Sequence, residues 1–129
     1  MRTRPIDHHR QLIVWQRAME LLGSAYALAR DLPRHETFGM ASQMRRAATS
    51  IPSNIAEGHA RVHRGDFVHH LSIARGSLAE LETLIDACES LGYAAAERLV
   101  TARGQADEVR RMLATMIVRL RAKPAGGER

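Results

Sequence analysis

Apolar residues recur at every third or fourth position between Gly65 and Gly92, and this spacing determines the secondary structure of the segment. They are Phe67, Leu71, Ala74, Leu78, Leu81, Ile85 and Cys88. An α-helix of 3.6 residues per turn places all of them on one face, whereas a strand would require strict alternation. Gly65 predicts a break before this helix, Asp66 its N-cap and Gly92 its end.

Three other segments have the same periodicity, at about residues 12–31, 36–61 and 94–121, the second of them beginning near Glu36 or Thr37. The apolar positions of the last segment are Leu99, Ala102, Ala106, Val109, Leu113, Met116 and Leu120. Aromatic residues form 4% of the chain, which favours packed helices over sheets, because strands are rich in aromatic and β-branched side chains.

Four amphipathic segments joined by short loops predict an all-α fold, an up-down-up-down antiparallel four-helix bundle. We expect the bundle over residues 12–121, with an N-terminal arm at residues 1–11 and a flexible tail at residues 122–129. No run approaches ~18 apolar residues, and the basic N-terminus is not followed by the apolar run of a signal peptide. These patterns predict a cytoplasmic protein without membrane association.

Pro52 lies inside the helical periodicity of the second segment. A proline within a helix lacks the N–H of the hydrogen-bond ladder and clashes with the carbonyl four residues earlier, here that of Ala48. We therefore predict a kink at Pro52, with the side chains of Ser53 and Asn54 satisfying the displaced backbone groups.

Polar residues form a ridge along the same helix, opposite its apolar face. They are Gln43, Arg46, Ser50, Asn54, Glu57 and Arg61. The third segment also carries a second stripe, made of His70, Ile73, Ser77, Leu84, Ala87 and Leu91. The ridge is either a solvated outer face or a contact surface, and the stripe contacts either a second helix of the bundle or another subunit. Gly76 and Ser77 favour the close approach of another backbone.

The charge balance is basic, with 19 Lys and Arg residues, 14 Asp and Glu residues and a formal net charge of +5. A basic surface favours binding to nucleic acid, acidic partners or anionic lipid. The candidate phosphate-binding residues are Arg45, Arg46, Arg61, Arg64, Arg103, Arg110 and Arg111.

Several motifs occur together in one order along the chain. They are Trp15 with Gln16, Pro33 with Glu36, Phe38 and Gly39, Gln43 with Arg45 and Arg46, the block SIPSNIAEG at residues 50–58, Phe67, and the block ARGSLAELET at residues 74–83. With these motifs, residues 12–93 resemble the four-helix bundle family first noticed in open reading frames within intervening sequences of bacterial large-subunit ribosomal RNA genes. The fourth helix is similar in pattern only.

The resemblance implies a cytosolic bundle that assembles as a ring of five and has no established enzymatic activity. A more distant similarity, to the accessory protein of diversity-generating retroelements, implies RNA or DNA, or a nucleic-acid-processing protein, as partners. The expected subunit interface or polar network comprises Gln43, Arg46, Ser50, Pro52, Ser53, Asn54, Glu57, Gly76, Ser77 and Glu80, with Glu82 nearby.

Histidines gather around the turn that precedes the third helix. With the neighbouring carboxylate they are His59, His63, Asp66, His69 and His70. Imidazoles and a carboxylate are ligands for zinc or nickel, but this segment spans a loop, so we expect a solvated turn and predict no metal or cofactor. A ferritin-like site is excluded because Glu-x-x-His is approximated once, by Asp66 and His69. Cys88 lies in the apolar seam and is interpreted as core, so a cysteine hydrolase is not predicted.

One enzymatic alternative remains, a HEPN-type, metal-independent ribonuclease. Its motif places an Arg and a His about four to six residues apart at a helix start, and Arg64 with His69 or His70 has this spacing. The Arg would steady phosphate charge while the His acted as general acid or base. Gly65 follows the Arg, where that motif has a polar residue.

The sequence therefore favours a non-enzymatic, homo-oligomeric and most simply pentameric bundle, with a nucleic-acid-associated or scaffolding role. The alternatives are the ribonuclease and a pure protein-interaction module that does not bind nucleic acid.

Overall fold

The computed structural model describes residues 7–122, which form four α-helices and contain no strand. The helices are α1 (Ile13–Asp31), α2 (Met40–Ala60), α3 (Arg64–Ser90) and α4 (Ala96–Ala122), with short 3₁₀ turns η1 (His9–Gln11) and η2 (Arg34–Glu36). The predicted all-α class is confirmed. Most of the predicted arm at residues 1–11 and of the predicted tail at residues 122–129 lies outside the described residues.

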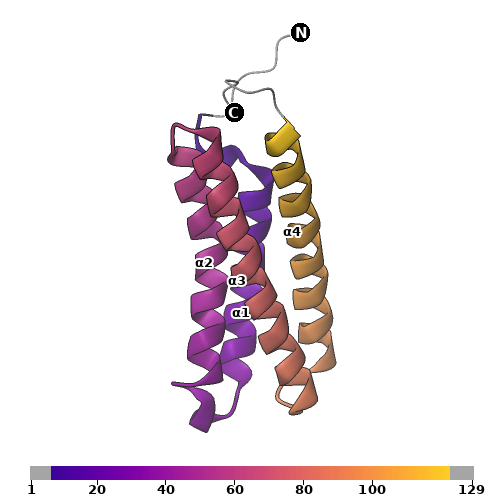
Figure 1. Cartoon of the computed structure of the whole chain (residues 1–129). Coiled ribbons are helices and arrows are strands. Elements are labelled where there is room, and N and C mark those ends of the chain that lie inside the picture. Colours follow the sequence, from indigo (N-terminus) through magenta and orange to yellow (C-terminus); the bar gives the residue numbers. More distant parts are fainter. Residues whose placement is uncertain (1–6, 123–129) are drawn as a thin grey trace.

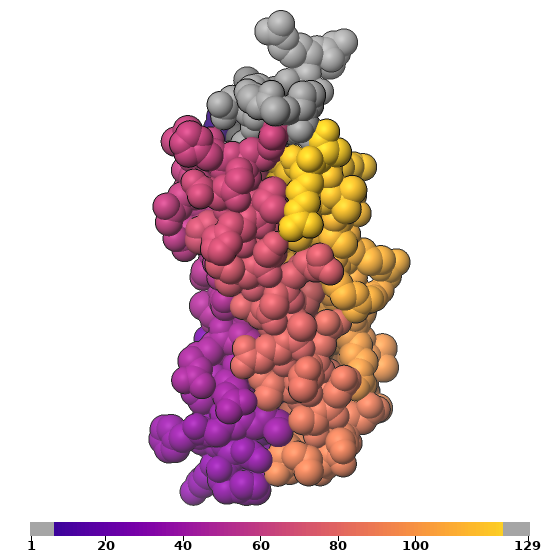
Figure 2. All heavy atoms as spheres, viewed as in Figure 1, coloured from indigo at the N-terminus to yellow at the C-terminus, as the bar shows by residue number. Residues whose placement is uncertain are grey.

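The helices stand side by side, and each contacts two others. α1 and α3 both contact α2 and α4, whereas the two diagonal pairs have no Cα atoms within 8 Å of each other in the described chain. In Figure 1 the chain runs down α1, up α2, down α3 and up α4. Figure 2 shows an elongated molecule in which α3 crosses the viewed face between α2 and α4. None of the helices in the described part is both long and apolar enough to cross a bilayer.

The core lies along the common axis of the helices and is filled by aliphatic side chains. Its largest fully buried members are Leu21, Leu28, Met44, Ile51, Ile55, Leu71, Leu78, Leu81, Ile85, Leu113 and Ile117. Every predicted apolar position of α3 from Phe67 to Cys88 is buried, so that prediction is confirmed. In α4 the prediction was wrong at one position, since Ile117 is buried and Met116 only partly so. The next core residue after Leu113 is therefore four positions later, at Ile117, and not three positions later, at Met116.

α2 begins at Met40, later than the predicted start near Glu36 or Thr37. The intervening chain forms η2, and Oε1 of Glu36 accepts a hydrogen bond from the backbone N–H of Met40 at 3.2 Å. Glu36 thus satisfies one of the free N–H groups at the start of the helix instead of being part of it.

α3 begins at Arg64, so Gly65 lies inside the helix and does not break it. The N-cap is His63 in extended backbone, and the predicted cap Asp66 lies in the first turn. A carboxylate in the first turn is favoured by the helix dipole, which explains an acidic residue there without capping. The predicted end at Gly92 is confirmed: φ of Gly92 is 69°, and Tyr93 and Gly92 donate to the carbonyls of Cys88 and Glu89, a Schellman motif.

Pro52 is buried within α2, and helical structure continues on both sides of it. The kink predicted at Pro52 stays a prediction. Of the two predicted hydrogen-bonding neighbours, Asn54 donates from Nδ2 to the carbonyl of Ser50 at 2.9 Å. The group that Asn54 satisfies is therefore the Ser50 carbonyl and not that of Ala48.

Candidate functional site

A continuous polar network crosses from α2 to α3 on the outer side of the bundle. Oγ of Ser50 lies 2.7 Å from Oγ of Ser77, and Nδ2 of Asn54 donates to Oγ of Ser50 at 3.0 Å. On its other side Asn54 presents Oδ1 to Nδ1 of His70 at 3.1 Å. Ser50, Asn54 and Ser77 were predicted for a subunit interface, and the structure joins them within one chain.

These contacts determine one ring nitrogen of His70 that must carry a proton. Since Nδ2 of Asn54 donates to Ser50, Oδ1 must accept, and Nδ1 of His70 therefore donates a proton to it. Nε2 of His70 then faces Oε2 of Glu57 at 3.7 Å, and Glu57 accepts from Arg61 at 2.9 Å. The pKa of Glu57 is lowered first by the Arg61 hydrogen bond and then by the charge of His70.

α2 and α3 pack tightly against each other beside this network, at Gly58. A Cβ atom on Gly58 would lie 2.7 Å from Cβ of His70 and 3.1 Å from Cδ1 of Phe67. A side chain at residue 58 would therefore push the two helices apart, and the absence of one fixes where His70 stands relative to Asn54.

The other residues predicted for the interface are not brought into this network. Gln43, Arg46, Ser53, Gly76 and Glu80 are exposed. A Cβ atom on Gly76 would meet nothing within 4 Å. Glu82 pairs with Arg110 of its own chain at 2.8 Å. Of the second α3 stripe, Leu84 is buried but Ile73 and Leu91 are exposed, so the stripe does not pack fully inside the bundle.

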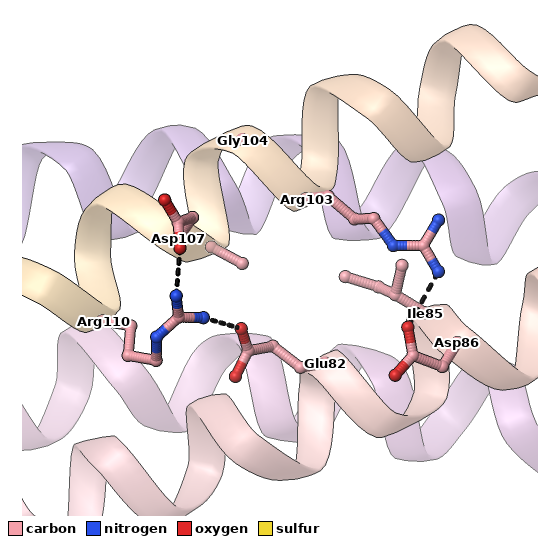
Figure 3. Close-up of a pocket in the computed structure, with 8 residues that line it drawn as sticks. Glu82, Ile85, Asp86, Arg103, Gly104, Asp107 and Arg110 are labelled. Carbon is pink, nitrogen blue, oxygen red and sulfur yellow. Dashed lines mark hydrogen bonds and ion pairs between the residues drawn. The ribbon is translucent and has the colours of Figure 1, made fainter.

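A charged pocket of about 570 Å³ lies between α3 and α4 and is shown in Figure 3. We call it the α3–α4 pocket. Arg103 reaches from α4 to Asp86 at 2.8 Å and to Glu89 at 2.9 Å, and these hydrogen bonds raise the pKa of the guanidinium. Arg110 lies between Asp107 and Glu82. The predicted phosphate contacts Arg103 and Arg110 are thus neutralised by carboxylates of the same chain.

Arg111 and Arg61 are also paired, with Asp107 and Glu57 respectively. Every Arg–carboxylate pair that joins two different helices among residues 7–122 has one member on α4. These pairs are Arg17–Glu108, Arg98–Asp31, Arg103–Asp86, Arg103–Glu89 and Arg110–Glu82. By contrast, the hydrogen bonds between side chains of α2 and those of α1 and α3 in the described chain involve hydroxyl, amide and imidazole groups.

A second pocket, of about 450 Å³, opens on the outer side of α1 and α2, and we call it the α1–α2 pocket. It is lined by Tyr26, Ser42, Arg45, Arg46, Thr49, Ser50 and Ser53. Sequence reasoning identified Arg45, Arg46, Ser50 and Ser53 but missed Tyr26, Ser42 and Thr49. The signal was present, because Ser42, Thr49 and Ser53 are spaced by seven and four residues and share one stripe of a helix.

The histidine cluster is dispersed by the fold. In the part of the chain that the structure describes, no three His, Cys, Asp or Glu residues are arranged to hold a metal ion. The ring of His59 packs edge-on against Phe67 with centroids 5.8 Å apart, and His70 is held by Asn54 and Glu57.

The Arg–His pair of the ribonuclease alternative is placed at the start of α3. His69 is exposed, whereas the His70 side chain is only 13% exposed and both of its ring nitrogens face groups on α2. His70 is therefore occupied by the α2–α3 network, which leaves His69 as the histidine accessible to a substrate near Arg64.

The model of a protein family described as "23S rRNA-intervening sequence protein" matches residues 10–115, which include all the motifs from Trp15 to Thr83 and most of α4. The chain belongs to this family. The match extends through α4 to residue 115, where the motif resemblance had reached residue 93.

A solved structure supports the same fold for this family member. It is the crystal structure of a protein with unknown function from the S23 ribosomal protein family of Bacteroides thetaiotaomicron. The two chains are 25% identical, with a TM-score of 0.75, and the similarity covers 81% of this chain and 95% of the other. No curated protein matches the sequence.

Proposed function

We propose that this family member is a non-enzymatic, homo-oligomeric accessory protein that associates with nucleic acid in the cytoplasm, and that its assembly is a pentamer. The observation that supports assembly is the exposed apolar side chain of Ile73 beside Gly76 on α3. A glycine within a helix costs up to about 1 kcal/mol relative to alanine, and no contact among the described residues requires one next to this apolar side chain.

A second subunit packed against this part of α3 accounts for the glycine, because the missing side chain lets another backbone approach. Ile73, one turn earlier, is 39% exposed and would be covered by the same contact. The exposed interface candidates are Gln43, Arg46, Ser53, Gly76 and Glu80. Ser50, Asn54 and Ser77 would support this surface from beneath, through the α2–α3 network.

Association with nucleic acid is supported by the formal net charge of +5 and by Arg45 and Arg46, which form no ion pair with a carboxylate of residues 7–122. Repetition of each weak phosphate contact around a ring would increase the overall affinity.

The assembly is tested by light scattering on the purified protein over a wide concentration range. We expect a mass of five times 14.4 kDa. Gly76→Gln is expected to lower the mass, because a longer side chain would separate the subunits. Gly104→Gln is the matched control, since Gly104 is also an exposed helical glycine with nothing within 4 Å of a Cβ atom. A mass of 14.4 kDa at every concentration would overturn the proposal.

Binding is tested by fluorescence anisotropy with labelled single-stranded RNA and double-stranded DNA at low and high salt. Phosphate contacts release counterions, so affinity should fall steeply between about 50 and 200 mM salt. If an oligomer forms but neither nucleic acid binds at low salt, the role is that of a protein-interaction module.

The absence of catalysis is tested by incubating the protein with mixed RNA beside an Arg64→Ala/His69→Ala variant. We expect equal, background cleavage by both. Cleavage by the unchanged protein alone would support the HEPN-type alternative and contradict the proposal.

A further inference from the structure

The α1–α2 pocket differs from the α3–α4 pocket in its charge balance. The α3–α4 pocket holds two arginines and three carboxylates, which pair with one another. The α1–α2 pocket holds Arg45 and Arg46 and no carboxylate. Neither of these arginines forms an ion pair with any carboxylate of residues 7–122. The α1–α2 pocket therefore carries an uncompensated charge of about +2 within one small concave surface.

The helical geometry of α2 places hydroxyl groups between the two arginines. At about 100° per residue, Ser42, Thr49 and Ser53 lie within about 40° of one another, and Arg45 and Arg46 lie on opposite sides of this stripe. All five residues line the pocket. Two guanidinium groups that flank a row of hydroxyls match an anion with several oxygen atoms, which accepts hydrogen bonds on more than one side.

Contacts within the pocket fix some donors and leave others available. The Thr49 hydroxyl donates to the Arg45 carbonyl at 2.8 Å, so the Tyr26 hydroxyl at 3.4 Å must donate to Thr49. One nitrogen of Arg45 donates to the carbonyl of Thr37 at 3.3 Å, which uses one of its five N–H groups and restrains the guanidinium. The groups that remain to donate to a ligand are the Arg45 and Arg46 guanidinium groups and the Ser42 and Ser53 hydroxyls.

We propose that the α1–α2 pocket is a phosphate-binding site, in which Arg45 and Arg46 bind the phosphate oxygens and Ser42 and Ser53 donate further hydrogen bonds. The phosphate is a backbone phosphodiester of a bound nucleic acid. This assignment of the phosphate to a nucleic acid rests on the proposed function. This proposal assigns Arg46 and Ser53 to the ligand site rather than to the subunit interface, for which Gln43, Gly76 and Glu80 remain as exposed candidates. Arg103, Arg110 and Arg111 contribute little, because carboxylates already occupy them.

The test compares two variants that each remove two positive charges. Arg45→Gln/Arg46→Gln changes the pocket, and Arg75→Gln/Arg119→Gln is the control, since Arg75 and Arg119 are exposed on other helices and form no ion pair with residues 7–122. Anisotropy with labelled RNA and DNA at low salt should show a loss of about tenfold or more for the pocket variant and a clearly smaller loss for the control. Equal losses would overturn the proposal while leaving nucleic-acid binding in place.

A second measurement does not depend on nucleic acid. Inorganic phosphate is titrated against chloride at constant ionic strength, and the ¹H–¹⁵N spectrum of the full chain is recorded. Saturable shifts of the Arg45 and Arg46 side chains and of Ser42 and Ser53 support the site. If these shifts occur but nucleic acid does not bind, the phosphate site stands and its source is a free phosphate compound, while the proposed function fails. If phosphate produces no more change than chloride, the site is overturned.

Two controls keep the result interpretable. Circular dichroism establishes whether the variants are folded. If the double variant is not, Arg46→Gln alone is used, because the side chain of Arg46 forms no hydrogen bond or ion pair within the described chain that the substitution would break. Light scattering on the same samples checks the assembly. If the pocket variant loses nucleic-acid binding only because the oligomer dissociates, Arg46 is a subunit contact and the phosphate site is overturned.

Discussion

Asn54 contacts His70 across the α2–α3 interface, with Oδ1 of Asn54 3.1 Å from Nδ1 of His70. The same amide donates through Nδ2 to Ser50, which in turn contacts Ser77. Asn54 thus links the two serines, Ser50 and Ser77, to His70. The orientation of its amide also requires a proton on Nδ1 of His70.

Asn54→Ala should therefore destabilise the fold by about 1–2 kcal/mol, because it leaves the part-buried Nδ1 of His70 without a partner and removes a donor to Ser50. Urea unfolding followed by circular dichroism measures the change. Ser53→Ala is the matched control on the adjacent, exposed residue, and its effect should stay within about 0.5 kcal/mol. Equal effects of the two substitutions would show that the network adds no stability.

Alanine substitutions at Gly58 and Gly76 should have opposite effects on the stability of the bundle. At Gly58 the new Cβ atom would lie 2.7 Å from Cβ of His70, so we expect destabilisation by about 1–3 kcal/mol despite the better helix propensity of alanine. At Gly76 nothing lies within 4 Å, so the propensity gain of about 0.5–1 kcal/mol should appear.

The measurement is the urea midpoint of each variant at a protein concentration low enough to hold the chain as a monomer. A stabilised Gly58→Ala would contradict the close approach of α2 and α3 at this point.

Glu57 should titrate below its ordinary pKa, because Arg61 and then His70 stabilise its carboxylate. A carboxyl group whose folded-state pKa is lowered adds stability above its unfolded pKa of about 4.3, and this stability is lost as the pH falls through the folded-state pKa. Following the Glu57 side-chain carboxyl carbon by NMR should show the low pKa in the unchanged protein and a higher one in Arg61→Gln. Identical titration curves would refute the Arg61 contribution.

Cys88 should be inert in the native protein. It is fully buried, its Sγ contacts Sδ of Met40 at 3.8 Å, and burial raises the pKa of the thiol. Since the thiolate is the reactive form, a disulfide reagent at neutral pH should modify Cys88 at the rate of unfolding and rapidly in denaturant. Fast modification of the folded protein would show that the α2–α3 contact opens locally.

The parts of this fold that could be predicted are those in which apolar residues recur at helical spacing over several turns. The seam from Phe67 to Cys88 recurs over many turns, so its burial could be predicted from spacing alone. Helix starts depend on single side chains, and there the prediction failed, since Asp66 resembles a cap in sequence while His63 occupies that position. Met116 and Ile117 are both apolar, and the choice between them depends on the rotation of α4 against its neighbours.

The candidate site was predicted as a set of residue types rather than as a set of contacts. The ridge on α2 included Ser50, Asn54 and Glu57. Their contacts with His70 and Ser77 depend on how far α3 is shifted along its axis relative to α2, which the sequence does not give. From sequence, His70 fitted three patterns, a histidine-rich turn, a largely apolar stripe and the Arg–His spacing of a ribonuclease, and none of them indicated its contact with Asn54. The pairing of Arg103 and Arg110 with Asp86 and Glu82 likewise needed the register of α3 against α4.

The distribution of interhelical ion pairs makes the four helices respond unequally to their ionic surroundings. Dissolved ions weaken attractions between exposed charges and act far less on neutral hydrogen bonds and apolar packing. Since α4 takes part in every Arg–carboxylate pair between helices in the described chain, we expect added salt to weaken the polar attachment of α4 more than that of the other helices. The hydrogen bonds that join α2 to α1 and α3 should change less under the same conditions.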